Sequence, residues 1–335
     1  EKADNLACLT WLSAFKFQIL NKKSWKEIVM NQRPARKTQF KPSRRRRLFK
    51  WLTIILIFVA LGCTAGLLIP GLNSSRNASV KLSSPLKIVQ KVVSNSSSST
   101  ADSTNTQLQD AWKSTLQQAD GHVAIAVYSN QTKKTYTASN AANHSYRMAS
   151  TVKVSILVGL LMKQGTLNSS EQANAQAMIE NSSNTAASAL FVELGEKSGL
   201  QETFDKLGMT DSKAHEEWGL STTTPSDQLK LLNAIFYSSN LLSTSQQSYV
   251  RNLMQNVESD QQWGISAGST NFYLKNGWLD EDDGWIINSI GYIPGNNGAS
   301  DSYTIAVYTD DNSSMQNGEN TIEKLAKSTS KILNK

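Results

Sequence analysis

The segment Val152–Met162, with the sequence VKVSILVGLLM, is apolar on nearly every side of a helix. A surface helix carries a single apolar stripe, whereas a helix that is hydrophobic all round is buried. The segment therefore predicts a central helix that other elements enclose. Its only charged residue is Lys153, which lies near the predicted start of the helix.

Alternating apolar residues and turn signals predict the elements around this helix. Strands are expected at Val123–Tyr128, Lys134–Ala138, Phe272–Trp278, Gly284–Tyr292 and Ser302–Tyr308, and helices at Ser170–Leu194, with a polar break at 181–184, and at Asn320–Leu333. A further helix should begin with Thr224 as its N-cap and Pro225 in its first helical position. This order predicts an α/β (α+β) fold in which an antiparallel sheet is built from both chain ends and a helical lobe is inserted between them.

Charge is distributed unevenly along the 335 residues. Residues 1–50 carry 14 basic and 3 acidic side chains, whereas residues 108–335 carry 16 basic and 23 acidic ones. The net charge of +7 is therefore a property of the N-terminal arm. Because a nucleic-acid-binding domain would carry a basic face on its folded part, we expect no nucleic-acid partner.

The segment Trp51–Leu72 contains no charged residue. It is long enough for a transmembrane helix, which needs about 20 apolar residues. Residues 30–50 before it hold nine cations and no acid, and such a basic flank stays in the cytoplasm. We therefore expect a basic cytoplasmic arm at 30–50, a single-pass signal-anchor at 51–72 and an extracellular remainder. A buried core helix, a cleaved signal peptide and lipidation at Cys63 are the alternatives.

The chain begins at Glu1, and its first methionine, Met30, stands where the basic arm starts. We interpret residues 1–29 as upstream read-through or a misassigned start; an amphipathic segment lying on the membrane is the alternative. Residues 73–106 are rich in Ser, Asn and Thr, which predicts a disordered linker. Residues 107–335 then form the folded domain, which has no internal disulfide because the only cysteines, Cys8 and Cys63, precede it.

Ser150 and Lys153 lie three residues apart at the start of the buried helix, a spacing that places both on one helix face. A serine needs an adjacent base to act as a nucleophile, and a helix N-terminus offers N–H groups to an oxyanion. For Lys153 to be that base, its pKa must fall from about 10.4 to near 7. Burial and a nearby cation have this effect, and Lys275 is the expected cation.

Two further motifs complete the candidate site: Ser182-Ser183-Asn184 and Lys275-Asn276-Gly277. The Ser182 hydroxyl can relay a proton to a departing nitrogen, and the Asn184 amide can hold the amide of a substrate. Lys275 can bind a substrate carboxylate. Gly277, which has no side chain, lets the backbone approach closely.

In this order the motifs resemble those of the penicillin-recognising serine hydrolases, and within them the class A β-lactamases. The resemblance covers about residues 120–335. It implies a β-lactamase/DD-peptidase-like fold, an acyl-enzyme on Ser150, and an oxyanion hole formed by the N–H groups of Ser150 and Trp278.

Three features depart from the pattern of that family. Ser183 stands where the family has Asp, and Asn276 replaces the Thr of K-T-G, although its amide can still donate to a carboxylate. The loop that bears the deacylating Glu is contracted to residues 208–221. Glu217 is the candidate for that base, and a solvated loop carboxylate is the alternative. Because a positioned base contributes about 10²–10⁴-fold, an acyl-enzyme without one would persist.

Other chemistries find little support in the sequence. The three histidines, His122, His144 and His215, have no paired spacing, so we expect no metal site and no cofactor. The stretch Gly264–Gly268 matches the nucleophile-elbow pattern, but that fold requires a histidine after the serine and none follows Ser266.

The sequence thus predicts a membrane-anchored extracellular serine hydrolase, expected to be a monomer, that cleaves a β-lactam or a related amide. Ser150, Lys153, Ser182, Lys275 and Glu217 are the candidate catalytic residues, and Asn184, Asn276, Gly277 and Trp278 the candidate substrate-binding residues. One alternative is a penicillin-binding, DD-peptidase-like protein that acts on peptidoglycan stem peptides and deacylates slowly. The other is a wall-binding module without catalysis.

Overall fold

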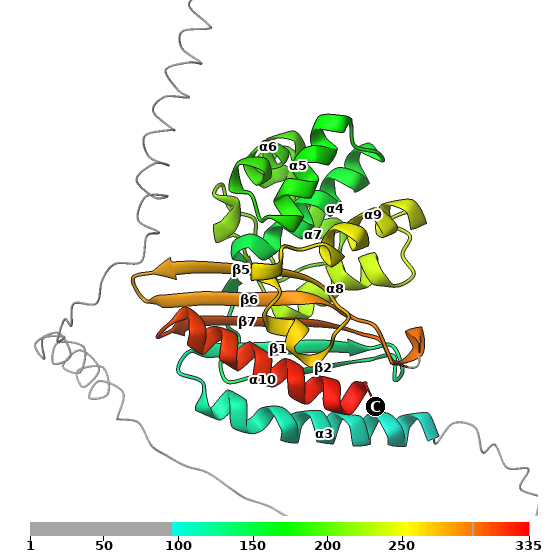
Figure 1. Cartoon of the computed structure of the whole chain (residues 1–335), viewed down its shortest axis with the longest axis vertical. Coiled ribbons are helices and arrows are strands. Elements are labelled where there is room, and N and C mark those ends of the chain that lie inside the picture. The colour runs from blue at the N-terminus through cyan, green and yellow to red at the C-terminus, as the bar shows by residue number, and fades with distance from the viewer. Residues whose placement is uncertain (1–95, 297, 335) are drawn as a thin grey trace, which may run out of the picture. The chain divides into compact units, whose positions relative to one another are not determined.

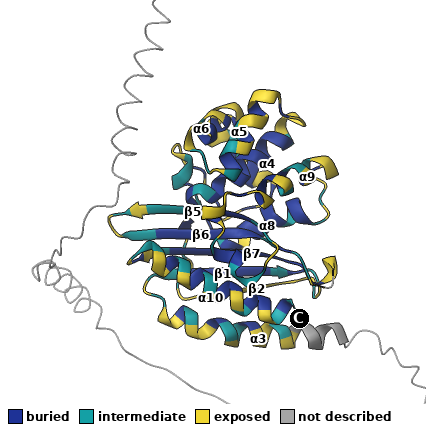
Figure 2. Ribbon diagram, in the orientation of Figure 1, coloured by how far each residue is buried: buried dark blue, intermediate teal, exposed yellow. Residues whose placement is uncertain are grey.

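The apolar segment forms helix α4 (Val152–Gln164), in which every residue from Val152 to Leu161 is buried. The structure is a computed structural model that describes residues 96–334 except residue 297. Figure 2 shows α4 in dark blue, between the sheet and the outer helices. The central buried helix predicted from the sequence is confirmed.

Five antiparallel strands form the main sheet, in the order β2-β1-β7-β6-β5. They are β1 (His122–Ser129), β2 (Lys134–Ser139), β5 (Tyr273–Glu281), β6 (Gly284–Ile293) and β7 (Tyr303–Asn312). The first strand pairs with the last, with His122 opposite Asp310 and Ser129 opposite Tyr303. The prediction of a sheet built from both chain ends is therefore confirmed, and β5 lies at its edge.

Helices cover both faces of this sheet (Figure 1). Helices α3 (Ser96–Gln118) and α10 (Met315–Leu333) lie along one face, and a lobe of helices covers the other. The lobe contains α4 together with α5 (Ser169–Glu180), α6 (Asn184–Leu194), α7 (Glu196–Lys206), α8 (Pro225–Phe236) and α9 (Thr244–Gln255). Alternate residues of each strand serve the two cores, so that Ile125 faces α3 and α10 while Ala126 faces the lobe.

Short elements connect the sheet to the lobe. Strands β3 (Tyr146–Arg147) and β4 (Thr222–Thr223) pair antiparallel beside the start of α4. A turn of 3₁₀ helix, η1 (Ala149–Thr151), leads directly into α4, and a second one, η2 (Trp218–Leu220), precedes β4. The remaining 3₁₀ turns are η3 (Ser259–Gln261), η4 (Gly264–Gly268) and η5 (Ala299–Asp301).

Local signals set the helix boundaries. Thr224 caps α8 by accepting a hydrogen bond from the Asp227 N–H, with Pro225 in the first turn as predicted. The polar break at 181–184 separates α5 from α6, and the Ser183 side chain caps α6 by accepting from the Ala186 N–H. A serine is as good an N-cap as an aspartate, so this helix start keeps its cap despite the departure from S-D-N.

The N-terminal boundary of the domain lies earlier than expected. Helix α3 begins at Ser96, inside the segment 73–106 that the sequence predicted as a linker. Leu108, Trp112 and Leu116 recur at helical spacing on the buried face of this helix. The indole N–H of Trp112 also donates to Thr329 Oγ1 of α10 over 2.9 Å. Packing against α10 therefore stabilises a helix whose serine-rich start indicated disorder.

The segments 1–29, 30–50, 51–72 and most of the linker lie outside the described residues. Within residues 96–334, no helix combines the length and apolarity needed to cross a membrane.

Trp112 provides a test of how much α3 contributes to the domain. We expect Trp112→Ala to lower the free energy of unfolding by about 3–5 kcal/mol, because a large buried side chain is lost and a cavity remains. The measurement is urea unfolding at equilibrium. Asp110→Ala, on the exposed face of the same helix, is the control and should stay within about 0.5 kcal/mol. Equal stabilities of the two variants would contradict the docking of α3.

Candidate active site

Ser150 lies in η1 at the entrance to α4, and Lys153 lies one turn later on the same face. The Lys153 ammonium nitrogen Nζ is 3.0 Å from Ser150 Oγ. The side chain of Lys153 is fully buried, whereas Ser150 is half-buried and accessible. The predicted Ser–Lys pair is therefore assembled, with the lysine enclosed and the hydroxyl open to a substrate.

Lys153 also reaches the loop between α5 and α6. Its Nζ lies 2.7 Å from the Ser182 carbonyl oxygen, 3.1 Å from Ser182 Oγ and 2.7 Å from Asn184 Oδ1. The Asn184 side chain itself is exposed. Its amide N–H₂ has no hydrogen-bond partner among the residues described, which leaves it free to donate to a bound substrate.

Lys275 enters the cluster from the edge strand β5. Its Nζ donates to Ser182 Oγ over 3.0 Å and to the carbonyl of Asn276 over 3.0 Å. The hydroxyl of Ser182 thus lies between two lysine side chains that are 93 and 29 residues away in the sequence. The three motifs converge on one hydroxyl, as their order in the sequence predicted.

Burial lowers the pKa of both lysines. The pKa of Lys153 falls to about 6, chiefly because burial disfavours its charged form and also because of repulsion from Lys275. Burial lowers the pKa of Lys275 to about 7. The sequence analysis expected the pKa of Lys153 to fall to near 7 through burial and a nearby cation. The direction of the shift and both of its causes agree with that expectation.

Among the described residues, no carboxylate pairs with either Lys153 or Lys275. The side chain over Lys153 is aromatic, since the Trp218 ring centre lies 5.0 Å from its Nζ. A buried cation without an anionic partner favours a ligand that brings its own negative charge.

The backbone around Ser150 adopts unusual conformations and close contacts that hold this residue in position. Ala149 (φ 48°) and Ser182 (φ 55°) both adopt the left-handed conformation that residues with a side chain rarely take. Such strained residues cluster at functional sites, where the surrounding structure holds them in place. A side chain at Gly277 would place its Cβ 2.7 Å from the Ser150 nitrogen, closer than atoms can pack. Glycine therefore lets β5 approach the start of η1.

The N–H of Ser150 meets the first requirement of an oxyanion hole. It has no hydrogen-bond acceptor among the described residues, and it lies beside Gly277 at the N-terminal end of the η1–α4 helix. Trp278 follows Gly277 on the edge strand and is partly buried. Its contribution of a second N–H stays a prediction.

Asn276 does not have the role that the sequence predicted. The side chain is fully buried, and its amide donates to the carbonyls of Gln261 and Trp263. Both donors are used to fasten β5 to the 261–263 segment, so Asn276 cannot donate to a substrate carboxylate. The correction follows from strand alternation, because Lys275 and Asn276 face opposite sides of β5.

Glu217 is not brought to the cluster. The residue is exposed, and within residues 96–334 no hydrogen bond joins its carboxylate to Ser150 or Lys153. Its neighbour Glu216 pairs with Lys197 at 2.8 Å on the surface. The contracted loop instead forms η2, which brings Trp218 over Lys153 and lets its indole N–H donate to Ser188 over 3.2 Å. The geometry therefore does not support Glu217 as the deacylating base.

Trp218 is a site residue that the sequence reasoning missed. The resemblance to the family instead indicated its neighbour Glu217 as the candidate base. The signal that could have indicated Trp218 was a tryptophan within the contracted loop 208–221, because the family places this loop beside the active site.

Comparison with known proteins agrees with this geometry. Residues 168–333 match the model of the Beta-lactamase enzyme family. The matched segment contains Ser182, Asn184 and Lys275 but begins after Ser150 and Lys153, whose assignment rests on their motif and on the distances above. No curated protein sequence matches the chain.

Solved structures share the fold over about two thirds of the chain. A TLA-1 extended-spectrum β-lactamase aligns with a TM-score of 0.60 at 22% identity, over 69% of this chain and 100% of that one. A class A β-lactamase from Bacteroides cellulosilyticus gives 0.59 at 19% identity, over 69% and 97%. A PBP-A variant, in an acyl-enzyme complex with penicillin G, gives 0.57 at 17% identity, over 68% and 95%.

The domain therefore has a β-lactamase-like fold, and residues 168–333 resemble the Beta-lactamase enzyme family in sequence. The resemblance to that family and the β-lactamase/DD-peptidase-like fold predicted from the motifs are confirmed.

The two buried lysines should make stability depend on pH. A lysine of the unfolded chain has a pKa of about 10.4, well above the values of about 6 and about 7 for Lys153 and Lys275 in the folded protein. Between these limits the unfolded state binds more protons, so stability rises with pH, by at most about 1.4 kcal/mol per pH unit for each group.

Lys275→Met removes one of these groups. We expect the rise in unfolding free energy between about pH 7.5 and 9 to be smaller by up to about 2 kcal/mol in this variant, as measured by urea unfolding at each pH. Lys213→Met, at an exposed lysine, is the control and should follow the parent curve. If the Lys275→Met curve also ran parallel to that of the parent, Lys275 would not be neutralised by folding.

Proposed function

We propose that Ser150 is a nucleophile that is acylated by β-lactams or related amides and then released by hydrolysis. The observation that carries this proposal is the buried Nζ of Lys153, 3.0 Å from Ser150 Oγ and without an acidic partner among the described residues. With a pKa of about 6, Lys153 is largely unprotonated at neutral pH and available as a base.

The contacts of Lys153 match those of a neutral amine. Its two N–H groups can donate to the carbonyl oxygens of Ser182 and Asn184, each 2.7 Å away. Its lone pair then remains for the proton of the Ser150 hydroxyl. As this proton moves to Lys153, Ser150 Oγ bonds to the substrate carbonyl carbon, and the negative charge that develops on the carbonyl oxygen is stabilised by the Ser150 N–H.

The same cluster can complete the acylation step. The carbon–nitrogen bond of the substrate breaks, and the leaving nitrogen takes the proton of Ser182 Oγ, which Lys153 replaces with the proton it received. Lys275 stays 3.0 Å from Ser182 Oγ and presents its charge to a substrate carboxylate. Water then attacks the ester on Ser150, which gives the free acid and restores the hydroxyl.

The exposed position of Glu217 favours a second candidate, a penicillin-binding, DD-peptidase-like protein that deacylates slowly. No described carboxylate lies against Lys153 to activate the deacylating water, and Trp218 stacks there instead. The fold shared with PBP-A, which forms an acyl-enzyme with penicillin G, fits this outcome. Peptidoglycan stem peptides would then be the substrate class.

A labelling experiment tests both candidates. The full chain is incubated with a fluorescent penicillin and, separately, with a chromogenic cephalosporin. We expect covalent labelling of Ser150, its loss in Ser150→Ala, and labelling about 10²–10⁴-fold slower in Lys153→Met because the base is lost. Glu217→Gln is expected to leave the lifetime of the label unchanged.

The outcomes separate the candidates. Sustained colour indicates a β-lactamase, and a stable Ser150-dependent label with little colour indicates the slowly deacylating protein. A label that persists about 10²-fold longer in Glu217→Gln would restore Glu217 as the base. If neither reagent reacts at Ser150, the wall-binding alternative replaces both enzymes.

We also propose that residues 51–72 anchor the domain to the outer side of a cell membrane, on the basis of their uninterrupted apolar sequence and basic flank. The full chain, expressed in bacterial cells, should remain in the membrane fraction after an alkaline wash, and protease added to intact protoplasts should cleave it. A variant without residues 51–72 is the control and should be soluble. An alkaline-soluble full chain would contradict the anchor.

A further inference from the structure

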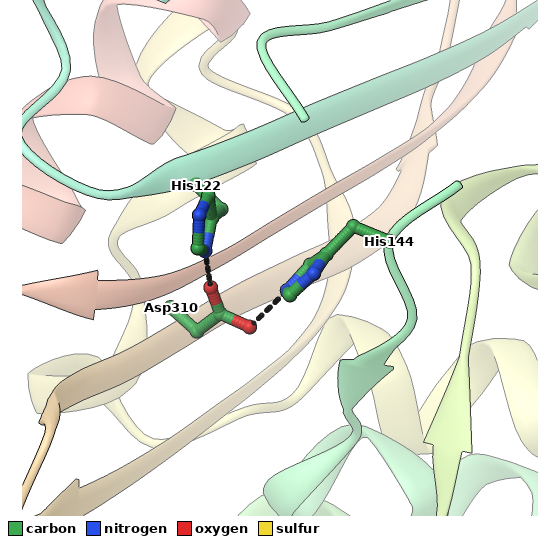
Figure 3. A group of neighbouring side chains, drawn as sticks. All are labelled: His122, His144 and Asp310. Carbon is green, nitrogen blue, oxygen red and sulfur yellow. Dashed lines mark hydrogen bonds and ion pairs between the residues drawn. The ribbon is translucent and has the colours of Figure 1, made fainter. Parts of the chain in front are cut away.

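Two of the histidines that look scattered in the sequence meet at one carboxylate (Figure 3). His122 begins β1, His144 lies in the connection between β2 and β3, and Asp310 lies near the end of β7. Both imidazole rings are directed toward the Asp310 side chain. His122 is brought there by strand pairing, since it lies directly opposite Asp310 in the sheet.

The three side chains form a compact group of ligand atoms. His122 Nδ1 lies 2.9 Å from Asp310 Oδ1, and His144 Nε2 lies 2.6 Å from Asp310 Oδ2. All three potential ligand atoms are within 4.8 Å of one another. A second carboxylate is adjacent, because Asp311 Oδ2 lies 3.3 Å from His122 Nδ1. Two ring nitrogens and one carboxylate from three segments therefore lie close enough together to share an ion, and Asp311 lies beside the group.

We propose that His122, His144 and Asp310 bind a divalent transition-metal ion, with water in the fourth position. Zn²⁺ takes imidazole and carboxylate ligands at about 2.0–2.2 Å in a tetrahedron. Such ligands lie about 3.4 Å apart, so the two short His–Asp contacts need to open by roughly 0.5–0.8 Å to admit the ion. Each imidazole then keeps its proton on the other ring nitrogen.

The donor set also indicates which ions the site selects. Imidazole nitrogens suit Zn²⁺, Ni²⁺ and Cu²⁺, whereas Ca²⁺ and Mg²⁺ take oxygen ligands in larger number. The side chains of His122 and His144 are 44% and 31% exposed, and that of Asp310 is 15% exposed. The ion can therefore enter from solvent, while the central carboxylate is largely enclosed.

A metal at this position would fasten the segment that leads into the active site. The ring of His144 packs against Tyr146 at 4.6 Å, and Tyr146 packs against Tyr308 at 6.1 Å. The hydroxyls of Tyr308 and Thr151 share a hydrogen bond of 2.6 Å, and Thr151 follows the nucleophile. The ion would thus join β1, β7 and the β2–β3 connection, which contact η1 through Tyr308 and Thr151. The proposal does not depend on the reaction at Ser150.

The test is calorimetric titration of the untagged full chain, freed of metal with a chelator, with Zn²⁺ alone. We expect saturable binding of one equivalent and a rise in melting temperature. Asp310→Asn and His144→Gln should each weaken Zn²⁺ binding at least about tenfold, since even loss of a residue behind a ligand costs 10–100-fold. His215→Gln, at the histidine outside the group, is the matched control and should bind as the parent does.

A third variant and further measurements distinguish loss of the site from loss of the fold. Circular dichroism checks that each variant folds, and His122→Gln, whose side chain is 44% exposed, provides a third variant with little effect on the core. Co²⁺ should give the intense visible absorption of a four-coordinate site, and excess Mg²⁺ or Ca²⁺ should not displace Zn²⁺. If no saturable binding is found, or if the folded His144→Gln and His122→Gln variants bind Zn²⁺ as the parent does, the proposal is wrong.

Discussion

The candidate site depends on two buried lysine side chains that both contact the hydroxyl of Ser182. Neither lysine forms an ion pair with a carboxylate of the described residues. Lys153 and Lys275 both lie within 3.1 Å of Ser182 Oγ, and both are fully buried. Desolvation disfavours the charged forms of both lysines, and repulsion from Lys275 adds to this effect at Lys153. The lowered pKa values destabilise the folded protein at low pH and suit Lys153 to its proposed role as a base. Three elements of the fold bring these side chains together. Helix α4 excludes water around Lys153, the edge strand β5 brings in Lys275, and the α5–α6 break supplies Ser182.

The same cluster explains why the first half of the proposed reaction is better provided for than the second. The groups that the proposed acylation requires lie together: the Ser150 hydroxyl 3.0 Å from Lys153 Nζ, the Ser182 hydroxyl beside both lysines, and the unpaired N–H of Ser150. A base for deacylation is not, because the contracted loop packs Trp218 over Lys153 and leaves Glu217 exposed. The group around Asp310 connects to the start of α4 through Tyr146 and Tyr308, so two separate polar clusters support the same segment.

The sequence predicted elements well where the signal was local. The strands β1, β2, β5, β6 and β7 and the N-cap of α8 appeared within a few residues of their expected positions, because periodicity and capping are read from neighbouring residues. It failed where the signal was distant. Helix α3 begins at Ser96 within a serine-rich segment and docks on α10 through Trp112, and α10 begins at Met315 rather than at Asn320. Asn276 was expected to meet a substrate, but strand alternation turns it toward residues 261–263.

The sequence by itself determined the chemistry available to this protein. The Ser-x-x-Lys spacing at the start of an apolar helix, and the order of the two later motifs, indicate a lysine-activated serine. Only the tertiary structure decided which groups meet. Strand pairing places His122 opposite Asp310, and loop contraction places Trp218 rather than Glu217 beside the base. These contacts join residues far apart in the chain, and no local pattern encodes such distances, because they follow from how the sheet and the helical lobe pack as a whole.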